Sequence, residues 1–343
     1  MYLDGPLGSR HGAVAMIKVH NLAKDFGTKR AVDGISFSVE RGEVLGFLGP
    51  NGAGKSTTMR MLTGFIPPSS GTATVGGFDV VENPIQAKRL IGYLPENAPA
   101  YTDMTVYGFL NFCADIRGLR GDDKKRAVNR VVEMCFLEPV LHQSVDTLSK
   151  GYRHRTCFAQ SIIHDPDVLV LDEPTDGLDP NQKHEVRGII RRMGEKKAII
   201  FSTHILEEVD AVCSRAIIID RGRIVANGTP LELRQKSEWA GAVTARFGNV
   251  TNGIVKQKLS QLVLAKKVIV LEEKPTACTV RVYPKQASKE LAWTIANLSQ
   301  TEKWTLEELH TEEGRLDEVF RSITMPDTAV NGAAPANETT QQG

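Results

Sequence analysis

The chain has 343 residues, of which 41% are hydrophobic and 24% charged, a composition typical of a globular protein with room for two domains. Its formal net charge of +1 excludes an overall field that would steer it to nucleic acid, so we expect no nucleic-acid partner. Because no apolar run reaches the ~20 residues of a membrane-spanning helix, we expect that the chain does not cross a membrane by itself.

The two ends of the chain carry no periodic pattern, and we leave both out of the expected fold. Residues 1–15 read as an upstream start or as the remnant of an expression tag. Residues 326–343 are small and polar, which is typical of a disordered tail. Between these ends, the sequence predicts two domains, over residues 16–236 and 240–325.

The first domain alternates short β-branched runs with helical patterns, which predicts an α/β fold. Nearly continuous apolar strands, such as residues 168–171 and 198–201, suit a largely parallel sheet that is covered on both faces. Residues 100–165 lack such strands and carry helical patterns instead. We therefore place a helical subdomain there.

The sharpest motif follows the strand that ends at Leu48 and is a complete GxxxxGK[ST] pattern. Its glycines let backbone N–H groups turn inward around phosphates, and the helix expected over Thr57–Leu62 adds a partial positive charge at its start. Lys55 is expected to reach the β- and γ-phosphates of ATP and act in catalysis, and the Ser56 hydroxyl to ligate Mg²⁺. The residues expected to hold the nucleotide are Gly49, Pro50, Asn51, Gly52, Ala53, Gly54, Lys55, Ser56 and Thr57.

A second signal lies at the end of the apolar strand Val168–Leu171, which is followed by Asp172 and Glu173. Ligands of open α/β sheets bind at this carboxyl edge. Asp172 is expected to hold Mg²⁺ through water, and Glu173 to polarise the water that attacks the γ-phosphate. Alone, such a pair is as often structural or capping. The phosphate loop upstream favours the catalytic interpretation.

The segment Leu148-Ser149-Lys150-Gly151-Tyr152 resembles the Leu-Ser-Gly-Gly-Gln signature of ATP-binding cassette (ABC) transporter subunits. It precedes a helix expected over Arg153–Ile163, which puts Ser149 and Gly151 at a positive helix end. The resemblance implies that these two residues contact the γ-phosphate held by a second copy, so that a head-to-tail dimer encloses two ATP molecules. The sequence departs from the signature at Lys150 and Tyr152.

Three further residues match that family in its own order. Asp179, in Gly-Leu-Asp, resembles the loop at the dimer seam, and His204 resembles the switch histidine that contacts the γ-phosphate. Phe26 fits the aromatic residue that stacks on adenine. Each has a structural alternative, since a histidine at a strand end or a phenylalanine in a turn is commonly a packing residue.

One position departs from the family in a way that bears on the metal. The glutamine that approaches Mg²⁺ in the family is replaced here by Glu96, a carboxylate that can ligate Mg²⁺ but adds negative charge. The Tyr-Leu-Pro-Glu form over 93–96 resembles a subset of export (ABC-2 type) ATPases that includes gliding-motility-associated subunits. The ending over Thr305–Thr324 also resembles that subset.

The second domain combines strands and helices in an α+β order. We expect strands at Val243–Phe247, Val268–Glu272, Thr279–Tyr283 and Thr305–Leu309, and helices around 250–262, 291–298 and Leu316–Ser322. This order resembles a split βαβ, ferredoxin-like arrangement. The expected fold is thus a P-loop ABC-type ATPase domain with a helical subdomain, followed by a small α+β domain.

The function implied is that of an ATPase, with ATP and Mg²⁺ as its ligands, that works as a homodimer and drives export through a separate multi-spanning membrane subunit. Five scattered cysteines suit a reducing compartment, so we expect it at the cytoplasmic face of the membrane. Two alternatives stay open at this point, a soluble ABC ATPase without a transport role and an importer subunit.

Overall fold

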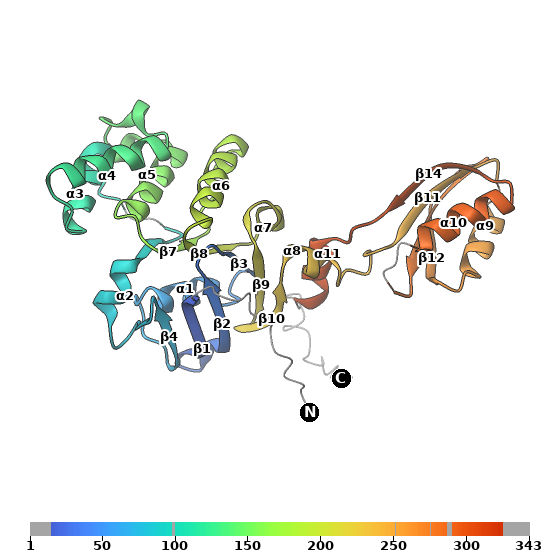
Figure 1. Ribbon diagram of the computed structural model, residues 1–343, viewed down its shortest axis with the longest axis horizontal. Coiled ribbons are helices and arrows are strands. Elements are labelled where there is room, and N and C mark those ends of the chain that lie inside the picture. Colours follow the sequence, from blue (N-terminus) through green and yellow to red (C-terminus); the bar gives the residue numbers. More distant parts are fainter. Residues whose placement is uncertain (1–14, 98–99, 251, 275, 287–289, 325–343) are drawn as a thin grey trace, which may run out of the picture. The chain divides into compact units, whose positions relative to one another are not determined.

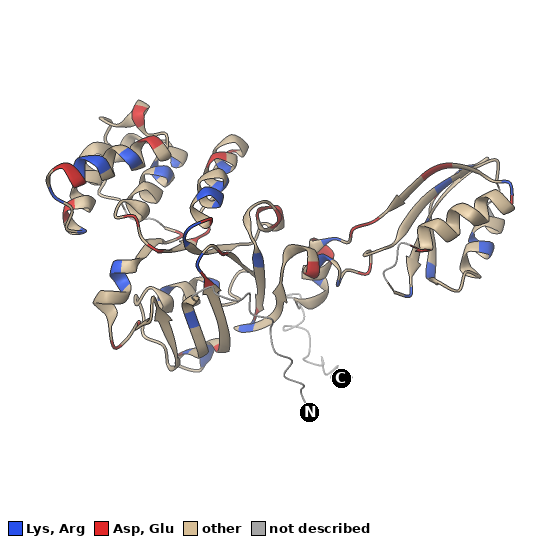
Figure 2. Ribbon diagram, in the orientation of Figure 1, with Lys and Arg blue, Asp and Glu red and all other residues tan. Residues whose placement is uncertain are grey.

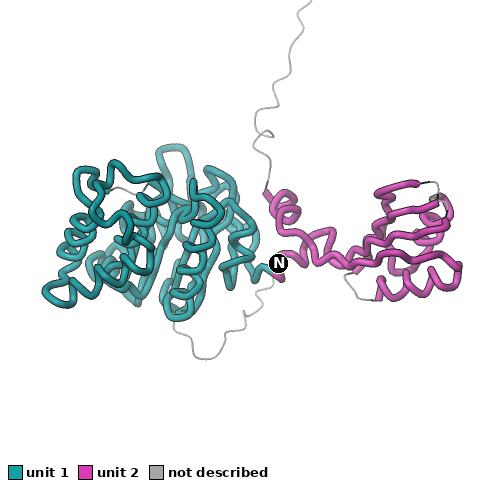
Figure 3. The backbone as a smooth tube through the Cα atoms, turned by 90° about the horizontal axis from the view of Figure 1, so that it is seen from above, with its two compact units in different colours: residues 1–230 teal, residues 231–343 magenta. Residues whose placement is uncertain are grey.

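A computed structural model describes residues 15–97, 100–250, 252–274, 276–286 and 290–324. The expected leader up to residue 14 and the expected tail fall outside these residues. The chain forms two compact units, Met1–Pro230 and Leu231–Gly343 (Figure 3). The domain limits inferred from the sequence, at 236 and 240, stay a prediction.

The first unit is built on a six-stranded sheet in the order β10-β9-β3-β8-β7-β6. The pairs β9–β3, β3–β8, β8–β7 and β7–β6 are parallel, and only β10 runs antiparallel to its neighbour, β9. The largely parallel sheet expected from the sequence is therefore confirmed. Its strands are β3 (Val44–Leu48), β6 (Ile91–Leu94), β7 (Val168–Asp172), β8 (Ala198–Thr203), β9 (Arg215–Asp220) and β10 (Arg223–Gly228).

A second, antiparallel sheet in this unit has the order β2-β1-β4-β5. Its strands are β1 (Ala15–Phe26), β2 (Lys29–Glu40), β4 (Ser70–Val75) and β5 (Phe78–Asp79). Buried apolar side chains of β1 and β2 pack with those of β3 and helix α1 (Lys55–Leu62) in one core cluster. In this cluster, the ring centres of Phe37 and Phe47 are 5.6 Å apart. Sequence reasoning found only a piece of this sheet, at Ile17–Val19.

The other core of the unit joins helices to the large sheet. Within residues 100–165, where the sequence predicts helices, the structure has α3, α4 and α5 (Figure 1). The helices of the unit after α1 are α2 (Pro84–Leu90), α3 (Val106–Ile116), α4 (Gly121–Met134), α5 (Lys150–Ile162), α6 (Pro180–Gly194) and α7 (Leu206–Val212), and α8 (Pro230–Arg234) begins at its end. Two short 3₁₀ turns, Glu138–Val140 and Val145–Thr147, lead into α5.

The second unit has the βαββαβ order that the sequence predicts. It comprises β11 (Val243–Gly248), α9 (Asn252–Ser260), β12 (Ala265–Lys274), β13 (Ala277–Pro284), α10 (Glu290–Thr301), β14 (Thr305–Thr311) and α11 (Leu316–Ile323). The strands lie in the order β12-β13-β11-β14 and all pairs are antiparallel. This is a ferredoxin-like sheet, with a core formed by side chains of the strands, α9 and α10.

Charges of both signs are interspersed along both units, in keeping with the net charge of +1 (Figure 2). Among the residues that the structure describes, no helix is both long enough and apolar enough to span a bilayer.

Candidate nucleotide site

The loop between β3 and α1 is shaped by glycines in conformations that other residues rarely adopt. Gly52 and Gly54 have φ angles of +79° and +108°. A Cβ atom on Gly54 would lie 2.6 Å from the carbonyl oxygen of Ala31, so a side chain fits neither the backbone angle nor the space. The strand–loop–helix context that the motif requires is present, with the helix starting at Lys55, two residues before the predicted Thr57.

Lys55 lies almost buried at the start of α1, with 6% of its surface exposed. Its Nζ donates hydrogen bonds to the carbonyl oxygens of Gly49 (2.7 Å) and Pro50 (3.3 Å), and lies 3.9 Å from a Glu173 oxygen. Burial lowers the pKa of Lys55, and the negative charges of Glu173, Asp172 and Glu96 oppose that shift. The loop thus holds a cation beside the two carboxylates that end β7.

Asp172 is buried at the end of β7 and accepts two hydroxyl hydrogen bonds on the same oxygen. The donors are Ser56 on α1, at 3.2 Å, and Ser202 on β8, at 2.5 Å. Hydroxyl and carboxylate oxygens are the ligands that Mg²⁺ prefers, and Glu96 lines the same cavity as Ser56. These oxygen donors therefore fit a magnesium ion.

Glu173 has a left-handed backbone, with φ of +50°, which a non-glycine residue adopts only at some energetic cost. Its backbone N–H donates to the Ser202 hydroxyl (3.0 Å), and its carboxylate is hydrogen-bonded to Nδ1 of His204 at 3.0 Å. Burial raises the pKa of Glu173, whereas His204 and Lys55 oppose the rise. The carboxylate is thus a stronger base than an exposed one and is held in a defined direction.

Lys55, Ser56, Glu96, Glu173 and His204 meet at a cavity of 580 Å³. Ten of the residues singled out in the sequence line it: Phe26, Asn51, Gly52, Gly54, Lys55, Ser56, Thr57, Glu96, Glu173 and His204. Phe26 is half exposed at the rim, with Nζ of Lys24 5.3 Å from its ring centre. Of the other predicted loop residues, Ala53 accepts a backbone hydrogen bond from Gly222.

Four residues of this region were missed by sequence reasoning. Lys29, Ala31 and Asp176 line the cavity, and Ser202 joins Asp172 to Glu173. The sequence offers one sign for Ser202, because it begins the Ser-Thr-His segment at the end of an apolar strand, two positions before His204. The other three carry no local motif, because they reach the cavity from β2 or from a turn.

Comparison with known proteins identifies the family. A family model described as ABC transporter matches residues 32–176. The Nod factor export ATP-binding protein I of Ralstonia nicotianae is 38% identical over 68% of this chain and 73% of its own length. The chain belongs to the ABC transporter ATP-binding proteins.

Two other similarities set the extent of the match. The probable multidrug ABC transporter ATP-binding protein YbhF of Escherichia coli is 38% identical over 65% of this chain, but the match spans only 38% of YbhF. A solved ATP-binding subunit of an ABC transporter superimposes with a TM-score of 0.60 at 27% identity, covering 64% of this chain and 92% of that one. The ABC fold expected for the first domain is therefore confirmed.

No residue of the ABC signature segment lines the nucleotide cavity, although Lys150 contacts Asp176, which does. Ser149 caps the N-terminus of α5, where its Oγ accepts from the Tyr152 N–H at 3.3 Å. Gly151 lies so close to the Gln182 side chain that a Cβ atom would clash with it. The departure from the signature, Lys150, forms an ion pair of 3.3 Å with Asp176.

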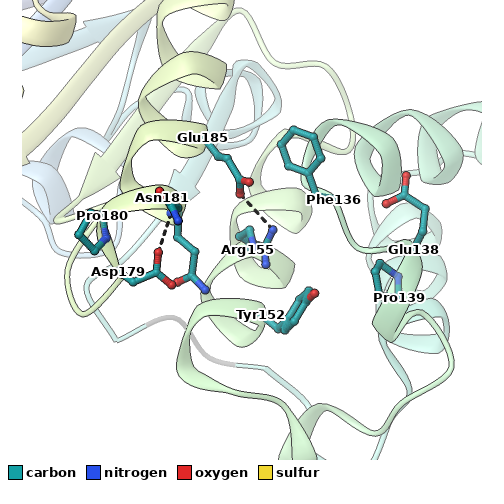
Figure 4. A pocket seen from close by; sticks show the side chains of 10 residues that line it. Phe136, Glu138, Pro139, Tyr152, Arg155, Asp179, Pro180, Asn181 and Glu185 are labelled. Carbon is teal, nitrogen blue, oxygen red and sulfur yellow. Dashed lines mark hydrogen bonds and ion pairs between the residues drawn. The ribbon is translucent and has the colours of Figure 1, made fainter.

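Asp179 likewise lies outside the nucleotide cavity. It caps α6 by accepting from the Gln182 N–H at 2.9 Å, and it lines another cavity, of 730 Å³ (Figure 4). Tyr152 and Arg155 of α5 line that second cavity too, with Arg155 paired to Glu185 at 3.3 Å. In one copy, the predicted residues therefore divide into a nucleotide group and a signature group.

Proposed function

We propose that this chain is the ATP-hydrolysing subunit of an ABC exporter, which couples Mg-ATP binding and hydrolysis in a head-to-tail dimer to movement of a separate membrane subunit. The observation that carries the proposal is the contact of Glu173 with His204 beside Lys55, at one cavity. A base, a hydrogen-bonding histidine and a buried cation are the groups that phosphoryl transfer to water requires.

Each residue has a definite task in this proposal. The glycine loop and Lys55 hold the β- and γ-phosphates, and Phe26 offers its half-exposed ring to the adenine. Glu173, whose pKa is raised by burial, accepts a proton from the attacking water, and His204 orients the Glu173 carboxylate.

The metal site in this proposal consists of Ser56, Asp172 and Glu96. When bound there, Mg²⁺ would neutralise developing charge on the phosphates. Asp172 is already hydrogen-bonded by Ser56 and Ser202, so its oxygens are oriented before the metal arrives.

The dimer in this proposal is supported by the separation of the two groups of residues. Ser149, Gly151 and Asp179 are absent from the lining of the nucleotide cavity, and Asp179 lines another cavity. A second copy in head-to-tail orientation would bring them to the phosphates, as C₂ symmetry then builds two equal sites.

Complementation between two inactive variants tests the dimer. Lys55→Ala disables the nucleotide cavity, and Ser149→Arg disables the signature end, so each pure variant should be inactive. In an equal mixture, half of the dimers are mixed and each retains one intact site, which restores about a quarter of the wild-type activity. A mixture as inactive as its components would reject the shared site.

Export through a separate membrane subunit is supported by the similarity to ATP-binding proteins of Nod factor export and multidrug transport. The Tyr-Leu-Pro-Glu form and the C-terminal segment lead us to place the chain near gliding-motility-associated ATP-binding proteins, at the cytoplasmic face of the membrane. Glu96 in place of glutamine disfavours the importer alternative.

A pull-down from gently solubilised membranes of the native host tests the transport role. We expect a multi-spanning protein without a phosphate loop to co-purify, and a Lys55→Ala control should retain it. Recovery of the chain in the soluble fraction with ribosomal, DNA-bound or no partners would favour the soluble ATPase.

A further inference from the structure

A glutamate on α7 is buried in the first unit without a cationic partner in any contact that the structure records for it. Glu208 exposes 1% of its surface. One of its carboxylate oxygens accepts from the Thr175 hydroxyl, and the other accepts from the Thr203 hydroxyl at 2.7 Å. A buried carboxylate that is hydrogen-bonded only by two neutral hydroxyls costs free energy compared with a carboxylate in water. The position of Glu208 therefore calls for a functional explanation.

The two threonines stand beside the residues to which the reaction is assigned. Thr175 lies two positions after Glu173, and Thr203 directly precedes His204. The ladder between β7 and β8 ends at the pair Asp172–Ser202. Past that pair, sheet hydrogen bonds no longer set the distance between the two chain segments, and the Glu208 carboxylate bridges them instead.

The bridge completes a closed ring. The backbone connects Glu173 to Thr175, and the Thr175 hydroxyl donates to Glu208. Glu208 also accepts from Thr203, which the backbone connects to His204. Nδ1 of His204 closes the ring at 3.0 Å from the Glu173 carboxylate. A ring of this kind fixes the direction of both side chains at once, because neither segment can shift without breaking a buried hydrogen bond.

From this ring we propose that Glu208 is a positioning residue for ATP hydrolysis, which holds the Glu173–His204 pair in reacting geometry without touching the nucleotide. The inference rests on the hydrolysis proposed above. Glu208 lies outside the residues that line the nucleotide cavity, so it acts only through Thr175 and Thr203.

Both carboxylate oxygens are needed for this task. The Thr203 hydroxyl already accepts the Ile205 N–H at 3.0 Å and uses its own proton for Glu208. Glutamine would keep the ring closed, because its NH₂ can donate to a threonine hydroxyl oxygen. In Glu208→Leu, both threonine hydroxyls lose their acceptor while the side chain keeps a similar volume. The ring is then opened at both hydrogen bonds.

Steady-state hydrolysis by the full chain, with phosphate release as the readout, is the first measurement. We expect Glu208→Leu to lower kcat about tenfold to a hundredfold, because small misplacements of reacting groups have effects of that size, while KM changes less than about twofold. Thr175→Val should give a loss of similar size. The matched control is Glu207→Leu on the same helix, an exposed neighbour that should keep the wild-type kcat.

A second measurement separates positioning from a structural role. In a Glu173→Gln background, single-turnover hydrolysis should fall less than about twofold on adding Glu208→Leu, because the group to be positioned is already gone. An equal loss in both backgrounds, or an unchanged kcat in Glu208→Leu, would overturn the inference. If the wild type hydrolysed ATP no faster than Lys55→Ala, the proposed function would fall and the inference with it.

Discussion

The two units handle the ends of their strands differently. In the parallel sheet of the first unit, the carboxyl ends of β3, β7 and β8 lie at one edge, so the phosphate loop, Glu173 and His204 meet there. In the antiparallel sheet of the second unit, neighbouring strands end at opposite edges. A parallel sheet therefore gathers polar groups from distant sequence positions, and an antiparallel sheet disperses them.

The charges of the two units differ accordingly. In the second unit, Arg246 of β11 pairs with Glu307 of the neighbouring strand β14 at 2.8 Å. Arg281 of β13 pairs with Glu312, just after β14, at 3.0 Å. At the nucleotide edge of the first unit, Asp172 and Glu173 are adjacent like charges beside one lysine. The contrast is between paired charges that stabilise the second unit and like charges gathered at the nucleotide edge of the first.

The largest expected effect is on hydrolysis in the first unit. Glu173→Gln should bind Mg-ATP and hydrolyse it about 10²- to 10⁴-fold more slowly, because a positioned base contributes that much. Phosphate release and the affinity for a fluorescent ATP analogue give the two quantities. Glu312→Gln, the same change in the second unit, should leave hydrolysis at the wild-type rate; near-normal turnover in Glu173→Gln would remove this residue from the role.

The second prediction concerns stability of the second unit. Arg281 is 12% exposed, pairs with Glu312 and lies 3.9 Å from the ring centre of Trp239, so Arg281→Met leaves a carboxylate unpaired and should destabilise the unit by about 3 kcal/mol. All three tryptophans, Trp239, Trp293 and Trp304, belong to this unit, so their fluorescence reports its unfolding alone.

Nucleotide affinity is the matching readout for the first unit in that experiment. It should stay at the wild-type value in Arg281→Met at a temperature where the second unit is still folded. Loss of nucleotide binding together with the tryptophan transition would show that the two units do not unfold independently.

The third prediction is a difference in acid sensitivity. His154 and His164 lie in and just after α5, their Nδ1 atoms are buried without a hydrogen-bond partner in the described chain, and burial lowers the pKa of each to about 4. A pKa below the unfolded value of about 6.5 means that the unfolded chain takes up protons first. Stability of the first unit should be complete above pH 6.5 and fall as the pH is lowered towards 4.

Urea unfolding followed by circular dichroism and by tryptophan fluorescence separates the two units in this test. The second unit has a single histidine, His310, which is exposed on β14. Its midpoint should therefore change less than that of the first unit between pH 6.5 and 4. In the double variant His154→Gln, His164→Gln, the free energy of unfolding of the first unit should fall less between pH 6.5 and 4. An unchanged pH dependence would contradict the assignment to these two histidines.

The smallest expected effect is on the hydrolysis rate when Lys150, which departs from the ABC signature, is replaced. The pair of Lys150 with Asp176 is exposed on both sides, and such pairs contribute about 0.2–1 kcal/mol. Lys150→Ala should therefore change the hydrolysis rate less than about fivefold, with Lys150→Arg as the control that keeps the charge. A loss as large as that of Glu173→Gln would give the pair a direct part in the reaction.

Local patterns were enough to predict much of the site. The glycine loop, Asp172 and Glu173 were found because a strand, its end and the following helix are consecutive in the sequence. The ferredoxin-like order was found for the same reason, since each strand and helix carries its own periodicity.

Other features depend on contacts between distant segments and could not be derived in this way. The antiparallel sheet was largely missed, because β1 has irregular register against both neighbours and its polar and apolar residues do not alternate cleanly. Ser202 and Glu208 were missed because each has a partner about 30 residues away in the chain, Asp172 and Thr175 respectively. A hydroxyl or a carboxylate in a sequence does not reveal which segment it will contact.

The left-handed backbone at Glu173 has a consequence for how the chain can evolve. Glycine adopts this conformation without strain, so Glu173→Gly would relieve the turn while removing the base. A single substitution would therefore exchange the carboxylate for a relaxed turn. In the proposed mechanism, the strain is tolerated because hydrolysis needs a carboxylate at this position.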